Sequence, residues 1–549
     1  MENKIGERIY KTKVLSSLEK VFCDEECIAE ETKRGSMLLN ERFSFQLAFV
    51  IEGERLDDVS FSINSEIKDY VNIRFVENVP SQMPCYHNHD DNILRDKPGL
   101  YPDVLIDMPK SVRLLNKQWR SIWITIDPKC NVKAGNYEIE ISMNQNDLNL
   151  TKDTFNIEII DKKLPEQDLI FTNWFHCDCI ATYYNIPLLS DEHFKRIEDF
   201  IKTATDYGMN MILTPLFTPA LDTEVGKERP TVQLVDVLKN GDKFEFSFEK
   251  LKRFIDICLK YNIKHFEYSP FFTQWGSKFT PKIMATENGE YKRIFGWDTL
   301  ANSDEYRNFL NQFLPKLIEF IKSENLQDKS WFHISDEPSL DDMENYEYAY
   351  NLIKEYLKDF KTLDAISNYE FYEKGYIKYP VVATNHIDIF IKNKVENLWA
   401  YYCCAQYEGV SNKFFNMPSH RNRILGIQLY KYNIKGFLHW GYNFWYSQFS
   451  KYPINPYLTS DAGCGFPSGD SYVVYPAENG VNVSLRFEVF YDALQDLRAL
   501  KLLECRLGKE KVLGILEEEC EITFKNYKHS SKWLLNVREK VNNLIKELI

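Results

Sequence analysis

The chain lacks several features that mark particular classes of protein. No stretch approaches the roughly 18 consecutive apolar residues needed to cross a bilayer, and residues 1–4 lack the apolar core of a secretion signal. Basic residues are too few for nucleic acid or an anionic membrane, since 67 Lys and Arg stand against 81 Asp and Glu and the net charge is −14. We therefore expect a soluble, cytoplasmic protein, unless a leader has been trimmed, with no nucleic-acid partner and no membrane insertion.

A disulfide framework is also missing. The 12 cysteines are scattered without regular spacing, and they include Cys177, Cys179 and the adjacent pair Cys403 and Cys404. This pattern favours free thiols in a reducing compartment.

Motifs for phosphate and metal binding are absent as well. The glycines between Gly463 and Gly469 do not lead from a strand into a helix, as a P-loop or dinucleotide-binding motif requires. The spacing of His176, Asp178 and Cys179 matches no standard zinc motif. His333 lies close in sequence to the acids Asp336 and Glu337, and it can support them as readily as it can bind a metal. We expect no metal and no cofactor.

The first part of the chain consists of short runs that alternate between apolar and polar residues. Residues 43–49 and 120–127 are examples, and turn signals such as Asp127-Pro128 separate such runs. Alternation with period two indicates strands. We predict an antiparallel β-sandwich over residues 1–165.

From about Leu169 short apolar runs alternate with amphipathic stretches, which is typical of βα units. Eight candidate strands follow one another, at residues 169–174, 210–213, 265–269, 330–335, 363–367, 387–391, 398–403 and 436–440. Eight parallel strands close a (β/α)8 TIM-type barrel, although a doubly wound open sheet would look similar. We predict a multidomain β plus α/β fold, with this catalytic barrel over residues 166–505 and C-terminal helices, residues 506–549, packed on the barrel.

The most informative segment is residues 331–338, where an apolar run ends in Asp336, Glu337 and Pro338. Barrel active sites lie at the carboxyl ends of the strands, so two acids at this place suggest acid/base chemistry. The alternative is that Asp336 merely caps a helix that begins near Pro338.

Adjacent acids suit one particular reaction of sugars. A conventional retaining glycosidase needs two carboxyls about 5 to 5.5 Å apart, and an inverting one needs about 6.5 to 9.5 Å, usually from different strands. In a 2-acetamido sugar, however, the substrate's own carbonyl oxygen can attack the anomeric carbon. The enzyme then needs one carboxylate by the amide nitrogen, Asp336, and one acid by the leaving oxygen, Glu337, which later acts as base.

The motif Ser335-Asp336-Glu337-Pro338, at the end of a fourth barrel strand and after an all-β domain, resembles glycoside hydrolase family 123, the β-N-acetylgalactosaminidases. Residues 436–445, 469–476 and 484–488 add to the resemblance, which covers roughly residues 165–505. It implies a retaining, substrate-assisted exo-enzyme that removes non-reducing terminal β-linked GalNAc, in some members from glycosphingolipid glycans. It also implies that Asp336 stabilises the oxazolinium ion and that Glu337 is the acid/base.

Candidate sugar contacts follow from their places after predicted strands. Trp440 is the candidate for the apolar face of the sugar, and Tyr401 or Tyr402 for the acetamide carbonyl, with only one of the two pointing inward because strand neighbours alternate. Further candidates follow other strands or lie in the last loop: Gln274, Trp275, Trp174, His176, Asn443, Trp445 and Asp470. Packing explains the first four of these as readily as ligand contact, and the last three, in the last loop, are weaker candidates.

Two other functional classes stay open at this point. One is a non-catalytic carbohydrate-binding protein on a barrel, although binding alone needs aromatic and amide side chains rather than two adjacent carboxylates. The other is a conventional glycosidase or a β-N-acetylglucosaminidase, because the C4 hydroxyl that separates GalNAc from GlcNAc is read by contacts that the sequence does not place. In each case the expected partner is a glycan, and an oligomer stays possible.

Overall fold

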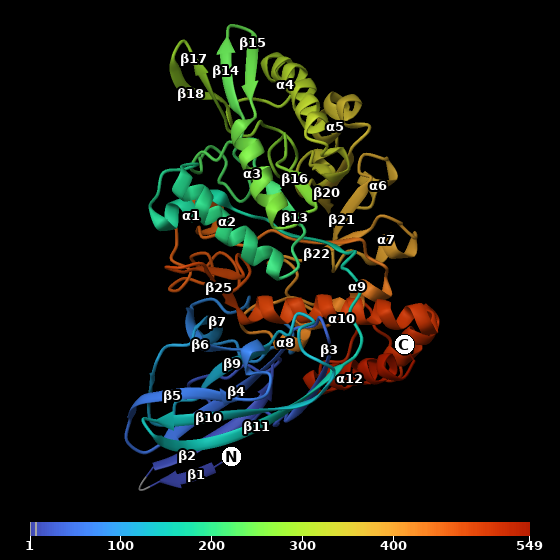
Figure 1. The fold of residues 1–549 in the computed structure, drawn as a ribbon. Coiled ribbons are helices and arrows are strands. Elements are labelled where there is room, and N and C mark those ends of the chain that lie inside the picture. Colours follow the sequence, from blue (N-terminus) through green and yellow to red (C-terminus); the bar gives the residue numbers. More distant parts are fainter. Residues whose placement is uncertain (1, 6–7, 549) are drawn as a thin grey trace.

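A computed structural model describes residues 2–5 and 8–548 (Figure 1). In this part of the chain two sheets build the N-terminal region. The first has the strand order β1 (Glu2–Ile5), β2 (Arg8–Ser16), β4 (Phe43–Glu52), β9 (Arg120–Ile126), β6 (Val71–Ser81), β7 (Gly99–Asp107), β25 (Val481–Ser484) and β24 (Val474–Pro476). The second has the order β3 (Arg34–Leu38), β11 (Leu148–Ile160), β10 (Gly135–Gln145), β5 (Leu56–Asn64) and β8 (Val112–Leu114).

The two sheets share one apolar core, as the alternating sequence pattern predicts. Phe45 of the first sheet stacks on Phe155 of the second, with ring centroids 4.1 Å apart. Two features differ from a simple antiparallel sandwich. β3 pairs with β11 in parallel, and the last two strands of the first sheet come from beyond the barrel. The division of the chain at residues 165 and 505 stays a prediction.

The next part of the chain forms a ring of parallel strands (Figure 1). Within the described residues the sheet has the order β12 (Ile170–Asn173), β23 (Gly436–His439), β22 (Trp399–Tyr401), β21 (Tyr379–Ala383), β20 (Lys361–Ile366), β19 (Ser330–Phe332), β16 (His265–Tyr268) and β13 (Met211–Thr214). Asn210, just before β13, joins the two ends of this order, because its backbone N–H donates to Phe171 O at 3.1 Å and its Oδ1 accepts from Phe171 N at 2.8 Å. The sheet is a nearly closed barrel, which favours the TIM-type prediction over an open sheet.

The prediction for the sixth strand is wrong. Residues 387–391 fall mostly in helix α7 (Asp388–Lys392), and the sixth strand is β21, earlier in the chain. A five-residue apolar run does not by itself distinguish strand from helix. Pro380 lies inside β21 and has no N–H to donate to a neighbouring strand, which argues from sequence against a central strand. Since Pro380 is the second residue of β21, its cost there is small.

Helices surround the barrel, and several begin as their sequences predict. The side chains of Ser190, Ser303 and Ser484 accept hydrogen bonds from the third residue of α2, α4 and α10 respectively. In chain order the helices are α1 (Cys177–Tyr184), α2 (Asp191–Asp206), α3 (Glu249–Lys260), α4 (Asp304–Ser323), α5 (Met343–Leu357), α6 (Glu370–Glu373), α7, α8 (Ser419–Arg423), α9 (Leu425–Lys431), α10 (Leu485–Leu507), α11 (Lys509–Leu516) and α12 (Ser531–Leu548). Short 3-10 turns occur at η1 (Lys68–Tyr70), η2 (Gln327–Lys329), η3 (Leu340–Asp342) and η4 (Gln448–Ser450).

Helix α10 lies between the barrel and the N-terminal sheets (Figure 1). At its start, Arg486 forms a buried, two-pronged ion pair with Asp103 of β7, at 2.7 and 2.9 Å. Glu488, two residues further along, pairs with Arg74 of β6. Because both pairs are shielded from water, they hold the N-terminal sheets against the base of the barrel.

A small sheet that the sequence analysis does not anticipate stands beyond the other end of the barrel, at the top of Figure 1. In the described chain its order is β15 (Lys243–Ser247), β14 (Asp236–Asn240), β17 (Ile283–Glu287) and β18 (Glu290–Phe295). Its two hairpins are insertions that follow β13 and β16. They extend the same end of the barrel at which the strands have their carboxyl ends.

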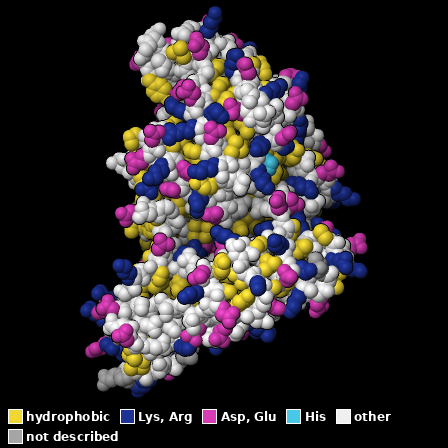
Figure 2. All heavy atoms as spheres, viewed as in Figure 1, with side chains coloured by type: hydrophobic (Ala, Val, Ile, Leu, Met, Phe, Trp, Pro, Cys, Tyr) yellow, Lys and Arg dark blue, Asp and Glu magenta, His cyan; other side chains and the backbone are white. Residues whose placement is uncertain are grey.

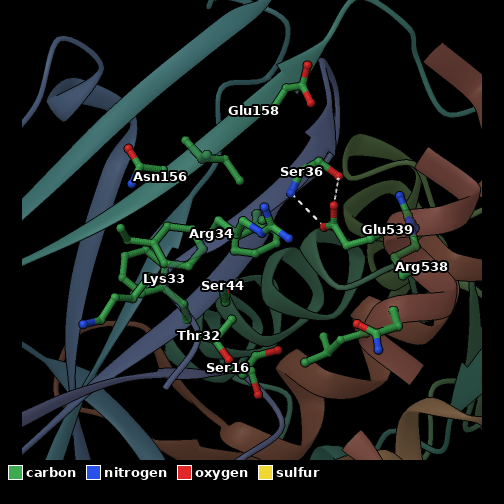
Figure 3. Close-up of a pocket in the computed structure, with 18 of the residues that line it drawn as sticks. Ser16, Thr32, Lys33, Arg34, Ser36, Ser44, Asn156, Glu158, Arg538 and Glu539 are labelled. Atoms are coloured by element: carbon green, nitrogen blue, oxygen red, sulfur yellow. Dashed lines mark hydrogen bonds between the residues drawn. The ribbon is translucent and has the colours of Figure 1, made fainter. Parts of the chain in front are cut away.

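The outer surface carries mixed charge. Figure 2 shows acidic and basic side chains interspersed over the viewed face. Over residues 2–5 and 8–548, no helix is both long and apolar enough to cross a membrane. A groove of about 920 Å³ runs between the N-terminal sheets and α12, where Ser36 N and Oγ donate to Glu539 at 2.9 and 2.8 Å (Figure 3). None of the residues that line this groove takes part in the site described next.

Candidate functional site

The acid pair lies in the loop that follows β19, at the carboxyl end of the barrel. Asp336 and Glu337 both line one pocket there. Glu337 has a φ of 44°, a left-handed conformation that is rare for a residue with a side chain and costs about 1–3 kcal/mol. Side chains of consecutive extended residues point to opposite sides, so this change of backbone direction lets both acids face the same space.

Three hydrogen bonds to neighbouring strand ends hold the loop in this conformation. Trp275 N donates to Asp336 O at 2.9 Å, Glu337 N donates to Ala365 O at 3.2 Å, and Ser335 Oγ donates to Thr273 O at 2.9 Å. The loop is thus fixed to the segment that follows β16 and to β20, and these two strands lie on either side of β19. The backbone of the acid pair is therefore positioned by hydrogen bonds to the neighbouring parts of the barrel.

The helix-cap alternative for Asp336 is not what the structure shows. Ser339 precedes the first turn, η3, and its backbone N and Oγ donate to the Asp342 carboxylate at 3.2 and 2.5 Å. Among the described residues, no group donates a hydrogen bond to the Asp336 carboxylate. Asp336 is therefore buried at 8% exposure with its carboxyl oxygens turned to the pocket and unbonded.

Both acids of the pair hold protons more tightly than usual. Burial, and then the charge of Glu337, raise the pKa of Asp336 well above its ordinary value. Glu337 is more open, but the surrounding protein still removes water from it and raises its pKa, against the lowering effect of Tyr401. The Tyr401 hydroxyl donates to Glu337 Oε1 at 2.5 Å. Two acids so close together resist ionising at the same time.

A buried charge cluster supports the loop from inside the barrel. His333 lies between two carboxylates, with Nδ1 2.9 Å from Asp364 Oδ1 and Nε2 2.5 Å from Glu267 Oε1. Burial alone would lower the pKa of His333, but hydrogen bonds to Asp364 and Glu267 raise it to about 10, so the ring is an imidazolium that donates to both. Asp364 also accepts from the backbone N–H groups of Ile334 and Ser335. The cluster therefore fixes the two residues that precede the acid pair.

Five of the predicted sugar contacts line the same pocket as the acids. They are Trp174, Gln274, Trp275, Tyr401 and Trp440. Two of the indole rings are held by hydrogen bonds: Trp174 Nε1 donates to Glu267 at 2.7 Å, and Trp440 Nε1 donates to Asp470 Oδ2 at 2.9 Å. Asp470 is itself buried behind Trp440 and does not line the pocket.

The remaining four predicted contacts lie outside the lining. Tyr402 points away from the pocket, where its hydroxyl donates to Asn422 Oδ1 at 3.4 Å. Asn443 bonds to the backbone of His176 in both directions, at 2.9 and 3.0 Å. Trp445 is buried and donates from Nε1 to Val474 O at 3.3 Å. Their polar atoms are thus engaged within the protein rather than in the pocket.

The residues that resembled metal ligands form an ion pair instead. Arg229 donates to both oxygens of Asp178, at 2.9 and 2.7 Å, and its Nη2 lies 3.2 Å from His176 Nδ1. Burial, and then the charge of Arg229, lower the pKa of His176 to about 3. The guanidinium thus occupies the side of His176 and Asp178 that a metal ion would need. In the described part of the chain, no group of three or more His, Cys, Asp or Glu side chains is arranged to hold a metal.

The pocket wall also includes residues that the sequence does not predict. The most polar of them is Asp222, which accepts from Phe449 N at 3.0 Å and whose pKa burial raises to about 6. It lies in an irregular connection between β13 and β14, where no periodicity points to it. The others are Leu221, Ala365, Cys403, Cys404, Leu438 and Phe466. Adjacency singles out Cys403 and Cys404 in the sequence, but nothing there places them at a site.

Comparison with known proteins agrees with this geometry. The family model for glycoside hydrolase 123, catalytic domain, matches residues 174–503, more than half of the chain. The fold is similar to that of a family 123 glycoside hydrolase from Clostridium perfringens, a structure that concerns glycolipid glycan hydrolysis. That match has 17% identity and a TM-score of 0.75, and it covers 98% of this chain and 97% of the other. No curated protein sequence matches the chain.

More distant structures resemble the barrel only loosely. A family 39 glycoside hydrolase from Bacteroides cellulosilyticus has 10% identity and a TM-score of 0.34, over 78% of this chain and 77% of the other. A family 5 xyloglucanase from Bacteroides ovatus has 8% identity and a TM-score of 0.29, over 85% and 99%. Structural similarity with TM-scores this low does not indicate a shared function. On the match to residues 174–503, the chain belongs to glycoside hydrolase family 123 and is a glycosidase.

Proposed function

We propose that the protein is a retaining exo-β-N-acetylgalactosaminidase that releases terminal β-linked GalNAc by substrate-assisted catalysis. The observation that carries the proposal is that two consecutive acids, Asp336 and Glu337, line one pocket. The amide nitrogen and the leaving oxygen of a 2-acetamido glycoside hang from adjacent sugar carbons. Two neighbouring carboxyl groups on a single loop are matched to two such neighbouring atoms.

In this mechanism the nucleophile belongs to the substrate. The acetamide carbonyl oxygen attacks the anomeric carbon while Glu337 gives a proton to the departing glycosidic oxygen. An oxazolinium ion forms, and Asp336 stabilises it by accepting a hydrogen bond from its N–H. Glu337, now a carboxylate, then takes a proton from water as that water attacks the anomeric carbon, so the β configuration is retained.

The protonation states that this mechanism needs can be set by the substrate itself. Among residues 2–5 and 8–548 no group donates a hydrogen bond to the Asp336 carboxylate, and burial and the charge of Glu337 raise its pKa well above the ordinary value. An acetamide N–H supplies the missing donor and favours the charged form of Asp336. The negative charge on Asp336 then favours the protonated form of Glu337, which is the form that a general acid requires.

Other lining residues offer contacts to the sugar ring. Trp440, fixed through its Nε1 by Asp470, presents an aromatic face of the kind on which the apolar side of a sugar stacks. Asp222 offers a carboxylate that can accept a hydrogen bond from a ring hydroxyl, since only one of its oxygens is engaged, by Phe449 N. Gln274 is less available, because its Oε1 accepts from Asp222 N at 2.8 Å.

The choice of GalNAc over GlcNAc as the proposed substrate rests on the family resemblance of the acid motif. The similar Clostridium perfringens enzyme is linked with glycolipid glycans, which supports a glycosphingolipid glycan as one natural substrate. Removal of GlcNAc is the second candidate, because the same two acids serve both sugars. The N-terminal sheets have the role of bracing the barrel in this proposal, through the ion pairs at the start of α10.

A panel of chromogenic substrates tests the proposal. The native protein and Asp336→Asn are assayed on β-GalNAc, β-GlcNAc, β-Gal and β-Glc glycosides of one aglycone. We expect turnover of β-GalNAc above β-GlcNAc, little or none of β-Gal and β-Glc, and a loss of about 10²–10³ in kcat for Asp336→Asn. Turnover of β-Gal at a rate comparable to β-GalNAc contradicts substrate assistance, and no turnover of any glycoside favours a binding protein.

A further inference from the structure

Two adjacent thiols form part of the pocket wall. Cys403 and Cys404 lie just after β22, beyond Tyr402, and both line the pocket that holds the acid pair. Both are free and half-buried. They lie close enough to each other for their side chains to interact, and Cys404 also contacts the Tyr86 hydroxyl. Cys403 also packs against the apolar cluster inside the barrel, but the proposed glycosidase mechanism uses neither thiol.

The turn that carries the two thiols is fixed by its backbone. Cys403 N donates to Gln406 Oε1 at 2.8 Å, while Cys403 O accepts from Gln406 N at 3.1 Å and from Asn412 Nδ2 at 2.9 Å. Gln406 is held in turn by Asn385, at 3.0 Å. These bonds fix the backbone at Cys403, and both thiols line the pocket.

The same rigidity disfavours a disulfide between the two residues. Neighbouring Cα atoms are about 3.8 Å apart across a trans peptide, whereas disulfide-linked residues usually have Cα atoms about 4.4–6.8 Å apart. A bond between Cys403 and Cys404 would have to distort the turn and its three hydrogen bonds. The pair is therefore expected to stay reduced and available to a reagent that bridges two sulfur atoms.

We propose that Cys403 and Cys404 form a dithiol site for a trivalent arsenical, and that its occupation closes the active-site pocket. In the reaction, the two S–H groups condense with an R–As=O compound. Two As–S bonds form and the As=O bond breaks, and the oxygen leaves as water with both thiol protons. No atom changes oxidation state, so no oxidant or reductant is required.

A chelating ligand suits this pair better than a reagent for single thiols does. The neighbouring Cys404 thiol, and then burial, raise the pKa of Cys403 well above its ordinary value. Alkylation and peroxide oxidation need the thiolate, so both are slowed at Cys403. Within the described residues no third His, Cys, Asp or Glu completes a metal site, which leaves a two-sulfur ligand set that matches arsenic with one organic substituent.

Occupation of this site would interfere with catalysis because of where it lies. Cys403 is near enough to Glu337 for the charge of that carboxylate to contribute to the raised pKa of the thiol. Tyr401 and Trp440 line the same pocket. An arsenic atom bridging the two sulfurs, with a phenyl group attached, would fill space that the sugar needs.

Phenylarsine oxide tests this inference on the full-length protein. We expect one molar equivalent to be bound, as measured by intact mass, with loss of turnover of the substrate that the native protein cleaves best. A small dithiol should restore both the mass and the activity, whereas a monothiol at the same concentration should not. N-ethylmaleimide should inactivate more slowly.

Matched serine variants assign the site. Cys403→Ser and Cys404→Ser should each lose the stable adduct and the inhibition, measured as the ratio of treated to untreated activity of the same variant. Cys130→Ser and Cys505→Ser, at exposed positions, should behave as the native protein does. Melting temperatures of all variants show that they are folded.

Three results would overturn the proposal. They are no stable adduct on the native protein, an adduct that persists in Cys403→Ser or Cys404→Ser, and an adduct that leaves turnover unchanged. Because the mass measurement does not depend on activity, it tests the thiol site even if the protein cleaves no GalNAc glycoside.

Discussion

Two pairs of charged side chains at the same end of the barrel show opposite arrangements. Asp178, in the first turn of α1, receives two hydrogen bonds from Arg229, and the whole group is buried. Asp336, in the loop after β19, is also buried, but its carboxylate has no donor among the described residues, and the charge that acts most strongly on it is that of another acid, Glu337. The first arrangement is satisfied within the protein. The second is complete only when a ligand supplies a donor.

The difference teaches where to look for chemistry in this fold. A buried carboxylate without a donor is costly, since burial penalises its charged form. Here a residue with positive φ, Glu337, adds to that cost. Asp178 and His176 resemble a functional cluster in the sequence, yet both already contact the Arg229 guanidinium. Unbonded polar groups that face a cavity, rather than polar groups as such, mark the site.

The largest expected effect is that of Glu337→Gln. Removal of the acid should lower kcat/KM by about 10²–10⁴ on a glycoside with a poor leaving group, because proton transfer to the glycosidic oxygen is lost. The loss should be much smaller on an activated aryl glycoside, whose leaving group needs little help. Steady-state kinetics on both substrates measure this. An equal loss on both contradicts the assignment of Glu337 as general acid.

Arg229→Met should act on stability rather than on chemistry. Removal of one partner of a buried ion pair leaves Asp178 uncompensated, and we expect a loss of about 3–5 kcal/mol in the free energy of unfolding. Denaturant unfolding measures the loss. Below the onset of unfolding, kcat should change little, and Glu337→Gln should show the reverse pattern. A large fall in the kcat of folded Arg229→Met would show that the Asp178–Arg229 pair also takes part in catalysis, which would contradict the contrast with the acid pair.

Asp222→Asn should weaken activity and change its pH dependence. Burial raises the pKa of Asp222 to about 6, so its carboxylate is present above that pH and is lost as the pH falls through 6. If the carboxylate accepts a sugar hydroxyl, the variant should lose about 10- to 100-fold in kcat/KM at pH 8, the range for a hydrogen bond to a charged group. The loss should shrink toward pH 5, because the native carboxyl is then protonated. A loss that stays constant with pH would assign Asp222 a structural role.

Tyr401→Phe should have the smallest effect of the four. The variant loses one hydrogen bond to Glu337, worth about 0.5–1.5 kcal/mol, which corresponds to a change of up to about tenfold in kcat/KM. Since that bond lowers the pKa of Glu337, its loss should move the alkaline limb of the pH–rate profile upward. Tyr402→Phe is the matched control, because its hydroxyl faces Asn422 instead. Equal pH profiles for the two variants would exclude Tyr401 from the acid's surroundings.

Much of the fold could be predicted from sequence because the pattern is local. Seven barrel strands lie where apolar runs place them, and the N-terminal strands follow their alternation. The sixth strand could not be predicted, because Pro380 argues against a central strand at β21 and the next apolar run is helical. The strands β24 and β25 join a sheet whose other members precede them by several hundred residues, and only the folded chain brings such segments together.

The site was partly predictable for the same reason. Asp336 and Glu337 stand out because an apolar strand ends in them, and strand alternation limits Tyr401 and Tyr402 to one inward side chain, which proves to be Tyr401. Asp222 lies in an irregular loop without any pattern. His176 is hydrogen-bonded to Asn443 and Arg229, which are far away in sequence. Only the structure therefore shows that His176 lies outside the pocket lining.

The most direct test of the central proposal varies the nucleophile itself. A series of β-glycosides carrying N-acetyl, N-fluoroacetyl, N-difluoroacetyl and N-trifluoroacetyl groups has a carbonyl oxygen of falling nucleophilicity at nearly constant size. If the acetamide attacks the anomeric carbon, log kcat/KM should fall steeply along the series for the native protein. Rates that stay level along the series, or a covalent sugar adduct on a protein carboxyl group, would contradict substrate assistance.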